Sequence, residues 1–278
     1  MRKSPFIICL STAAITISAF VFIASCHRSK QPAVEDTGYA SDHATTEQTF
    51  NDVQTISDQA ANVGSGSLAF RTSAVTGSGC ATVTHSGDSI IIDFGPTDCL
   101  CHDGRKRKGK IIATYTGGGY TDSGSVHTIT FDNFYQNDNK VTGIKTVTNM
   151  GHNPLGQPFY NISITGAVTL NGGGTISVSW LRQRTWTAGY STPTDLTDDT
   201  YSITGSGTLT RANGMKITVN ISIPLVVAQS CHWIEQGAVV YSLPSGASRT
   251  LDFGNTPTCD DMATITLGNG TVRDITLP

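Results

Sequence analysis

Residues 160–180 decide the fold of this chain, and their sequence is YNISITGAVTLNGGGTISVSW. From Tyr160 to Leu170 the even positions hold apolar residues or glycine, and most of the odd positions hold polar residues. A period of two is typical of a β-strand with one apolar and one polar face. Asn171-Gly172 predicts a turn, after which Ile176, Val178 and Trp180 resume the alternation. The stretch therefore predicts a long antiparallel hairpin.

The same pattern recurs further along the chain. Apolar and polar residues alternate over residues 201–209 and again over 215–223, with Asn213-Gly214 as the turn between them. Long strands joined by short turns predict an all-β antiparallel meander, which forms a curved sheet or a sandwich as one domain over residues 67–278. Its apolar face needs a cover, which a second sheet, a helix or a ligand would supply.

One short helix is expected before the sheet, over residues 45–62. Thr45 and Gln48 match a capping box, and an apolar stripe follows at helical spacing. The stripe consists of Phe50, Val53, Ile56 and Ala60. Residues 26–44 have mixed charge and few large apolar residues, so we expect them to form a flexible tether.

The first 25 residues predict a lipoprotein signal peptide. Arg2 and Lys3 precede an apolar run from Phe6 to Ile23, and Ala24-Ser25 stand directly before Cys26. The run is also long enough for a membrane-spanning helix, but small residues at a cleavage position favour a signal peptide. Cys26 would become the first residue of the mature protein and carry fatty acyl chains such as palmitate, which would anchor it to a membrane.

Composition limits the partners. The formal charge is −3, and loss of the two basic leader residues would make it −5, while only 14% of the residues are charged. Nothing in this balance favours a nucleic acid. The expected contacts are the membrane, through the lipid anchor, and an envelope protein, glycan or lipid.

Two similar segments predict two local disulfides. Cys80 precedes a strand that ends in Asp-Phe-Gly before Cys99, and Cys231 precedes a second Asp-Phe-Gly before Cys259. An oxidising envelope compartment favours the pairs Cys80–Cys99 and Cys231–Cys259, which leaves Cys101 over, although Cys80–Cys101 competes with the first pair. Each Asp-Phe-Gly is expected to end a strand, with a buried Phe and a Gly in an unusual backbone conformation.

Several polar clusters are candidate sites. Cys99, Cys101 and His102 could ligate a soft metal, but a closed site needs a fourth ligand, so no metal and no cofactor is expected. Next to them, Arg105, Lys106, Arg107 and Lys108 form the strongest run of positive charge. This run could contact lipid head groups or an anionic glycan, and a solvated turn is the alternative.

Aromatic and acidic residues cluster around the connection near residue 190. Trp180 shares the apolar parity of its strand and is expected in the core, so Trp186 and Tyr190 are the better candidates for an exposed binding surface. Glycosidase chemistry needs two carboxylates at a set separation. Here the acids available are Asp195, Asp198, Asp199 and Glu235. Since no further catalytic motif is present, we expect no enzyme.

Three features together resemble uncharacterised envelope lipoproteins of the Bacteroidota type. They are the lipobox, the Thr49–Val53 helix segment, and the stretch from Asp93 to Lys110, which contains Asp-Phe-Gly, cysteines and Asp-Gly-Arg-x-Arg-x-Gly-Lys. The resemblance covers most of the mature chain and implies an envelope location, but no assigned activity. In better-known lipoproteins an aspartate after the acylated cysteine favours inner-membrane retention, so His27 implies delivery to the outer membrane.

The sequence thus favours a non-catalytic binding or structural module anchored in the envelope. A second hypothesis is a lipid carrier whose curved sheet holds acyl chains on its apolar face. The third is an enzyme that acts on glycans.

Overall fold

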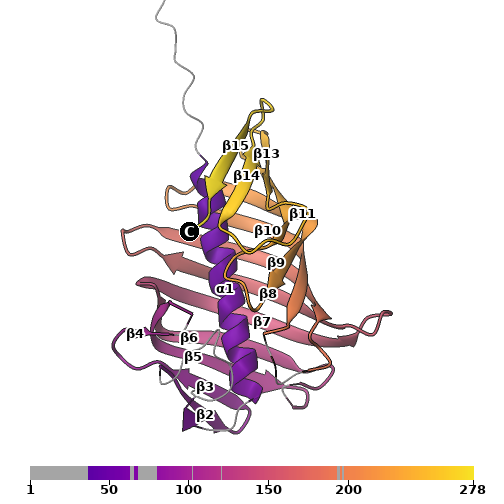
Figure 1. Cartoon of the computed structure of the whole chain (residues 1–278). Helices are drawn as coiled ribbons and strands as arrows, with labels where there is room; N and C mark the ends of the chain where they lie inside the picture. The colour runs from indigo at the N-terminus through magenta and orange to yellow at the C-terminus, as the bar shows by residue number, and fades with distance from the viewer. Residues whose placement is uncertain are drawn as a thin grey trace, which may run out of the picture. The chain divides into compact units, whose positions relative to one another are not determined.

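The computed structural model describes residues 37–62, 66–67, 80–101, 103–119, 121–192, 195 and 197–278. The predicted signal peptide, Cys26 and His102 lie outside the described residues. One helix, α1 (Gly38–Asn62), precedes the strands (Figure 1). The strands are β1 (Gly66–Ser67), β2 (Thr82–Ser86), β3 (Ser89–Asp93), β4 (Cys99–Leu100), β5 (Lys106–Thr116), β6 (Val126–Gln136), β7 (Asn139–His152), β8 (Pro158–Thr169), β9 (Thr175–Ala188), β10 (Thr200–Thr210), β11 (Lys216–Ala228), β12 (Gln236–Ser242), β13 (Ser248–Asp252), β14 (Met262–Thr266) and β15 (Val272–Thr276).

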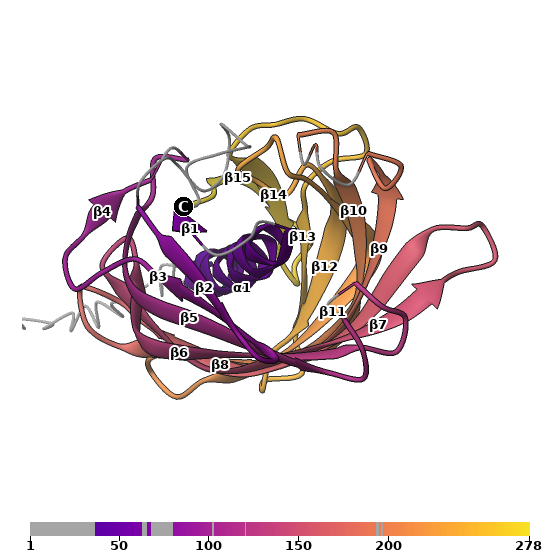
Figure 2. The ribbon, with the colours of Figure 1, turned by 90° about the horizontal axis from the view of Figure 1, so that it is seen from below.

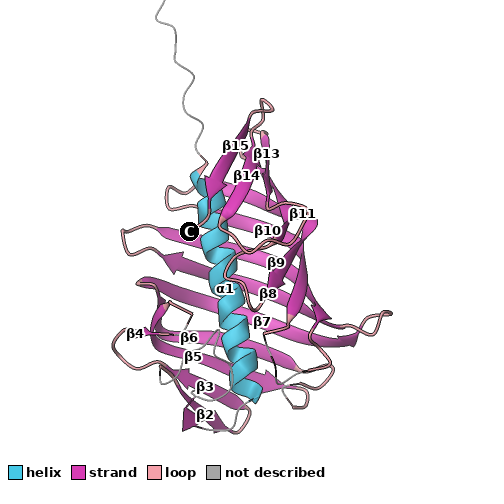
Figure 3. Cartoon of the chain, viewed as in Figure 1, coloured by secondary structure: helices cyan, strands magenta, loops and turns pink. Residues whose placement is uncertain are grey.

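All strands belong to one antiparallel sheet, in which neighbours along the chain are neighbours in space. The order runs from β1 to β15 without a crossover, and β4 pairs only with β5 at the side of this path. Figure 2 shows the sheet curving around α1, and Figure 3 shows the helix crossing the strands on the inner side of the curve. The predicted all-β meander with a curved sheet and one N-terminal helix is confirmed.

The alternation in residues 160–180 produces the expected hairpin. β8 pairs with β9 from Phe159 opposite Thr185 to Thr169 opposite Thr175. The side chains of Ile162, Ile164 and Trp180 are buried, at 5%, 3% and 1% exposure. The predicted core position of Trp180 is confirmed. The inner face of the sheet, which these residues line, is the face that contacts α1.

Ile223 breaks the pattern in β11. Its parity predicts a buried side chain, yet it is 42% exposed, whereas Ile221 is 8% exposed. The register with β12 shifts between Ile221 and Ile223, so an extra residue enters the strand there. Such a bulge reverses which face the following side chains point to, and the alternation beyond it no longer predicts burial.

The helix begins earlier than predicted. It starts at Gly38, so residues 38–44, which the sequence predicts as part of the tether, are helical, and residues 26–36 of that tether lie outside the described residues. Tyr39, Ala40 and Ala44 are buried against the sheet, and this packing extends the helix beyond the predicted capping box. Gln48 forms no cap but donates to the carbonyl of His232, at 2.6 Å. The predicted apolar stripe is confirmed, since Phe50, Val53, Ile56 and Ala60 are at most 1% exposed.

Both predicted disulfides are present, Cys80–Cys99 and Cys231–Cys259. The two Asp-Phe-Gly sequences also adopt the same turn. In each, the Asp side chain accepts a hydrogen bond from the Gly amide two residues later, at 2.8 Å in Asp93–Gly95 and in Asp252–Gly254. Both glycines have positive φ and both phenylalanines are 4% exposed, as predicted. The internal similarity in the sequence therefore marks two equivalent strand ends.

Candidate functional site

The acidic side chains of α1 pair with arginines of the sheet. These arginines occupy inward positions of strands or turns, where apolar residues are usual. The pairs are Asp42–Arg211, Glu47–Arg182 at 3.0 Å, Asp52–Arg105 at 3.1 Å and Asp58–Arg184 at 3.2 Å. A buried ion pair contributes little net stability, because desolvation offsets the attraction, but it penalises every arrangement that separates the charges. The pairs thus set how the helix lies across the strands.

The centre of this interface is a buried network around Glu47. Its carboxylate lies between Arg182 and His43. The ring of His43 is also hydrogen-bonded, through Nδ1, to the hydroxyl of Tyr241 at 3.0 Å. Burial alone would raise the pKa of Glu47, but the charge of Arg182 and the contacts with His43 lower it to about 2. Burial lowers the pKa of His43, so its imidazole is neutral at pH 7.

Lys145 is a buried cation without a carboxylate within salt-bridge distance among the described residues. It is 1% exposed and its amine donates to the carbonyl of Phe50, in the middle of α1, at 2.7 Å. Burial lowers its pKa to about 7, and the nearby charge of Arg184 acts in the same direction. Lys145 therefore holds the helix by a hydrogen bond to its backbone.

The basic run at residues 105–108 does not form a single exposed surface. Arg105 and Arg107 are 5% and 0% exposed, whereas Lys106 is exposed and Lys108 is partly exposed. Because β5 starts here, successive side chains point to opposite faces: the two arginines point inward and the two lysines outward. The prediction that all four residues form a binding surface or a solvated turn is therefore wrong for Arg105 and Arg107, which are buried.

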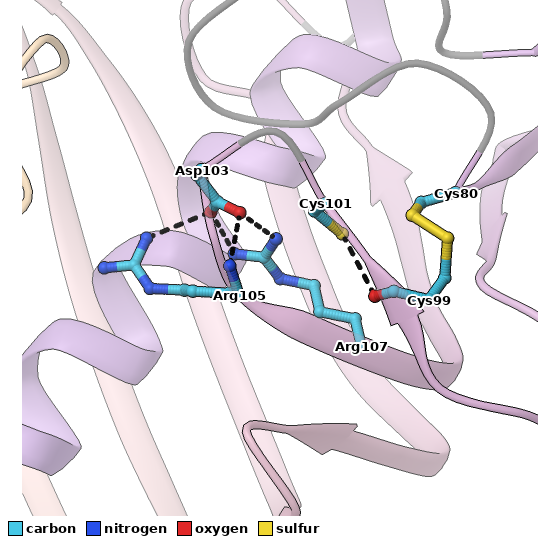
Figure 4. The surroundings of a disulfide bond; sticks show 6 residues. All are labelled: Cys80, Cys99, Cys101, Asp103, Arg105 and Arg107. Atoms are coloured by element: carbon cyan, nitrogen blue, oxygen red, sulfur yellow. Dashed lines mark hydrogen bonds and ion pairs between the residues drawn. A yellow bond between two sulfur atoms is a disulfide. The ribbon is translucent and has the colours of Figure 1, made fainter.

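Asp103 explains how the two arginines are accommodated. Figure 4 shows its carboxylate between them, and it lies 3.1 Å from Arg105 and 2.6 Å from Arg107. Burial would raise the pKa of Asp103, but the hydrogen bond from Arg107 and the charges of both arginines outweigh it, so the pKa is lowered. On the outer side, Lys108 pairs with Asp98 at 2.9 Å and lies over the ring of Tyr135. Arg105, Arg107 and Lys108 are therefore paired with acids of their own chain.

Cys101, which Figure 4 shows next to the Cys80–Cys99 disulfide, is not part of either disulfide, and its side chain is buried. Its thiol lies 3.8 Å from the carbonyl oxygen of Cys99, and burial raises its pKa. Cys99 is in a disulfide, so it offers no thiolate to a metal ion. Cys231 and Cys259, which lie near the carboxylate of Glu235, are likewise bonded to each other.

Trp186 and Tyr190 lie together at the end of β9, but only Tyr190 is exposed, at 40%. Trp186 is half-buried, stacks on Tyr201 and donates to the carboxylate of Asp199 at 3.0 Å. The other oxygen of Asp199 accepts from the hydroxyl of Tyr201 at 3.1 Å. Burial raises the pKa of Asp199 to about 6. Both carboxylate oxygens are used inside the protein, so this acid supports the aromatic cluster.

The opposite, outer face of the sheet carries a hollow of about 400 Å³, which we call the outer hollow. It crosses β7, β8, β9 and β10. Most of its side chains are short, neutral and polar, with one leucine among them, but most of the surface that they expose in the hollow is apolar. The lining residues are Thr146, Thr148, Asn161, Ile162, Ser163, Leu181, Arg182, Gln183, Thr204, Gly205 and Ser206. Two of these residues, Ile162 and Arg182, have buried side chains. The side chain of Arg182 binds Glu47 on the inner face.

Sequence reasoning did not find the inner charges or the outer hollow. A signal for the first was present: Arg182 and Arg184 continue the parity of Trp180 in β9, and Lys145 shares that of Val147 in β7. Charged residues at apolar positions of a strand indicate buried partners. The hollow had no such signal, because its polar residues look the same as any solvated strand face.

Among the described residues, the single helix is too polar to cross a membrane. Comparison of the chain with protein families, curated proteins and solved structures finds no match to any of them.

Proposed function

We propose that the protein is a lipid-anchored module of a bacterial cell envelope that works by binding rather than by catalysis, with the outer face of β7–β10 as its binding face. The anchor would be Cys26, exposed by removal of residues 1–25 and then acylated. His27 after the cysteine favours the outer membrane as the destination.

The observation that carries the proposal is that the two faces of the sheet differ: the helix fills one, and the other is open. The inner face is occupied by α1, which is held by ion pairs and by Lys145. The outer face holds the hollow of about 400 Å³, a size within the usual range of ligand sites. This difference between the faces favours the outer face as the place where a ligand binds.

The filled inner face also bears on the two other hypotheses. A lipid carrier would hold acyl chains where α1 lies, against residues such as Ile164 and Val178 that the helix and its neighbours already bury. A glycan-acting enzyme would need two free carboxylates. Asp199 has both oxygens bonded within the protein, and Glu235 lies beside the Cys231–Cys259 disulfide. The other two candidate acids, Asp195 and Asp198, are exposed and accept hydrogen bonds from Thr197 and Thr192. It is therefore the filled inner face and the bonded carboxylate of Asp199 that favour the binding module.

The anchor is tested by the intact mass of the protein extracted from its own membranes. The expected product begins at Cys26, carries acyl chains and contains two disulfides. A Cys26→Ser variant is the control, and it should remain unprocessed and unacylated. An uncleaved leader or an unmodified Cys26 in the wild-type protein would contradict the anchor.

The binding face is tested by photo-crosslinking in intact cells. A photoreactive residue at Ser163, in the outer hollow, should give a discrete crosslinked species, and one at Ser245, in the exposed β12–β13 turn, should not. Crosslinks at Ser245 alone would show that binding occurs away from this face. Crosslinks at neither position would contradict the proposed binding role.

A further inference from the structure

We infer that the outer hollow binds a neutral glycan chain that lies across the strands β7, β8, β9 and β10. The inference rests on the proposed function and adds the chemical class of the ligand. It follows from the shape of the hollow, from the polar groups that are free within it, and from its lack of charge.

The hollow is a trough because two rows of side chains border it. One row runs through cross-strand neighbours Thr146, Ser163, Leu181 and Ser206, and the other through Thr148, Asn161 and Gln183, with Thr204 opposite Gln183. Neighbouring strands lie about 4.8 Å apart, so the trough crosses the strands in steps close to the length of one pyranose unit in an extended chain.

Gly205 shapes the floor of the trough at β10. Gly205 has φ of +130°, and a Cβ atom there would lie 2.1 Å from the carbonyl oxygen of Leu181. The register between β10 and β11 shifts between Ile203 and Ser206, at the same place. Glycine thus allows β10 to approach β9 closely, in a register that is continuous from Tyr201 to Thr210, while the extra residues of the β10–β11 shift lie in β11.

The polar groups of the trough are available for a ligand. Gln183 donates weakly to Asn161 at 3.4 Å. Within the described part of the chain, no side-chain hydrogen bond engages the hydroxyls of Thr146, Thr148, Ser163, Thr204 and Ser206. Hydroxyls and amides both donate and accept, which is the pattern that sugar hydroxyls need.

The absence of charge and the presence of an apolar contact further narrow the chemical class of the ligand. Among the described residues that line the trough, none presents an ionised group to it, because the guanidinium of Arg182 is on the inner face with Glu47. An anionic head group or phosphate would therefore find no cation, and a cation no carboxylate. Leu181 is 67% exposed in the middle of one row and offers an apolar surface for the C–H face of a sugar ring. A neutral, hydroxyl-rich chain satisfies all three conditions.

The test uses the full mature lipoprotein in detergent micelles and measures binding of cellohexaose, maltohexaose and N-acetylchitohexaose by calorimetry. Hexagalacturonate serves as the anionic control. We expect saturable binding of at least one neutral hexaose, weaker binding of its disaccharide, and no binding of hexagalacturonate. Binding of the anionic chain alone, or of no glycan at all, would overturn the inference.

The site is tested by isosteric substitution. The double variant Thr146→Val and Thr148→Val removes two hydroxyls of the trough and should lower the affinity at least tenfold. The matched control, Thr165→Val with Thr208→Val, changes the same outer face outside the trough and should leave the affinity unchanged. Leu181→Ser keeps the hydroxyl rows and should also weaken binding. Equal effects of the trough and control variants would overturn the site.

The two proposals fail in different ways. If no glycan binds but the photo-crosslinker at Ser163 captures a defined protein in cells, the binding module stands and the glycan inference is wrong. If neither a glycan nor a crosslinked species is found, the proposed function itself is wrong.

Discussion

A guanidinium nitrogen of Arg182 lies 3.0 Å from a carboxylate oxygen of Glu47 at a place where both side chains are 2% exposed. Arg182 comes from the middle of β9 and Glu47 from the N-terminal half of α1, 135 residues apart. The guanidinium also lies over the ring of Trp180, 4.6 Å from its centroid. One pair thus joins the helix, a central strand and the aromatic core.

Loss of one member of this pair should be costly. Glu47→Gln keeps the shape of the side chain but leaves the charge of Arg182 buried without a counter-charge. We expect the free energy of unfolding, measured by chemical denaturation, to fall by about 3–5 kcal/mol. The double variant Glu47→Met with Arg182→Met should be much closer to wild type, since apolar residues of similar length fill the same space. If the double variant were as unstable as Glu47→Gln, the charge argument would be wrong.

This pair also shows where prediction from the sequence reaches its limit. The alternation of Ile162 and Ile164 with polar residues predicts strands because it is local, and the turn residues act locally too. What covers the inner face depends on contacts between residues more than 100 positions apart, such as Glu47 and Arg182. A basic run such as Arg105 to Lys108 therefore suggests a surface until the acids that neutralise it, Asp52 and Asp103, are located in space.

Lys145 predicts a pH dependence with a definite sign. In the unfolded chain its pKa is near 10.5, and in the folded protein burial lowers it to about 7. Between these values the unfolded chain holds a proton that the folded protein lacks, so the contribution of Lys145 to stability rises with pH. Below pH 7 the cost of burying the charge is fully present.

Lys145→Met removes that cost and also the hydrogen bond to the carbonyl of Phe50, which is typically worth about 1 kcal/mol. Since one pKa unit corresponds to about 1.4 kcal/mol, the variant should gain a few kcal/mol relative to wild type at pH 7. The gain should shrink as the pH rises from 7 toward 10.5, which unfolding curves at several pH values would measure. Lys106→Met, at an exposed position of the same sheet, is the control and should show no such trend. A difference between Lys145→Met and wild type that is constant over this range would contradict the assignment.

Asp199 predicts the opposite trend, in the acid range. Burial raises its pKa from 3.8 to about 6. Between these values the folded protein holds a proton that the unfolded chain has lost, so the contribution of Asp199 falls as the pH rises and its full cost applies above pH 6. The free energy of unfolding of Asp199→Asn, relative to wild type, should therefore increase by roughly 2 kcal/mol as the pH rises from 4 to 7.

The fluorescence of Trp186 offers a direct check on Asp199, because the indole donates to this carboxylate. Wild-type emission should titrate near pH 6, and the transition should be absent in both Asp199→Asn and Trp186→Phe. Persistence of the transition in Asp199→Asn would assign it to another group.

Gly166 marks a close approach of the helix to the sheet. A Cβ atom at this position of β8 would lie 2.5 Å from the ring of Phe50 and 2.9 Å from the carbonyl oxygen of Thr142. The even parity of residues 160–170 places Gly166 on the inner face, where the missing side chain leaves room for the phenylalanine of α1. Gly166→Ala should overpack this contact and lower the free energy of unfolding by about 1–3 kcal/mol.

The matched control for Gly166 lies in the same hairpin. At Gly172 a Cβ atom would have no heavy atom within 4 Å, and the backbone has no positive φ, so Gly172→Ala should be close to neutral. A second variant, Gly166→Ala combined with Phe50→Leu, shortens the ring that the new methyl group meets and should recover part of the stability lost by the single substitution. If Phe50→Leu and Gly166→Ala were simply additive, the two residues would not be in contact, because independent sites add and contacting ones do not. Coupling between them would show that a glycine in the strand and a phenylalanine in the helix together determine how closely α1 lies against the sheet.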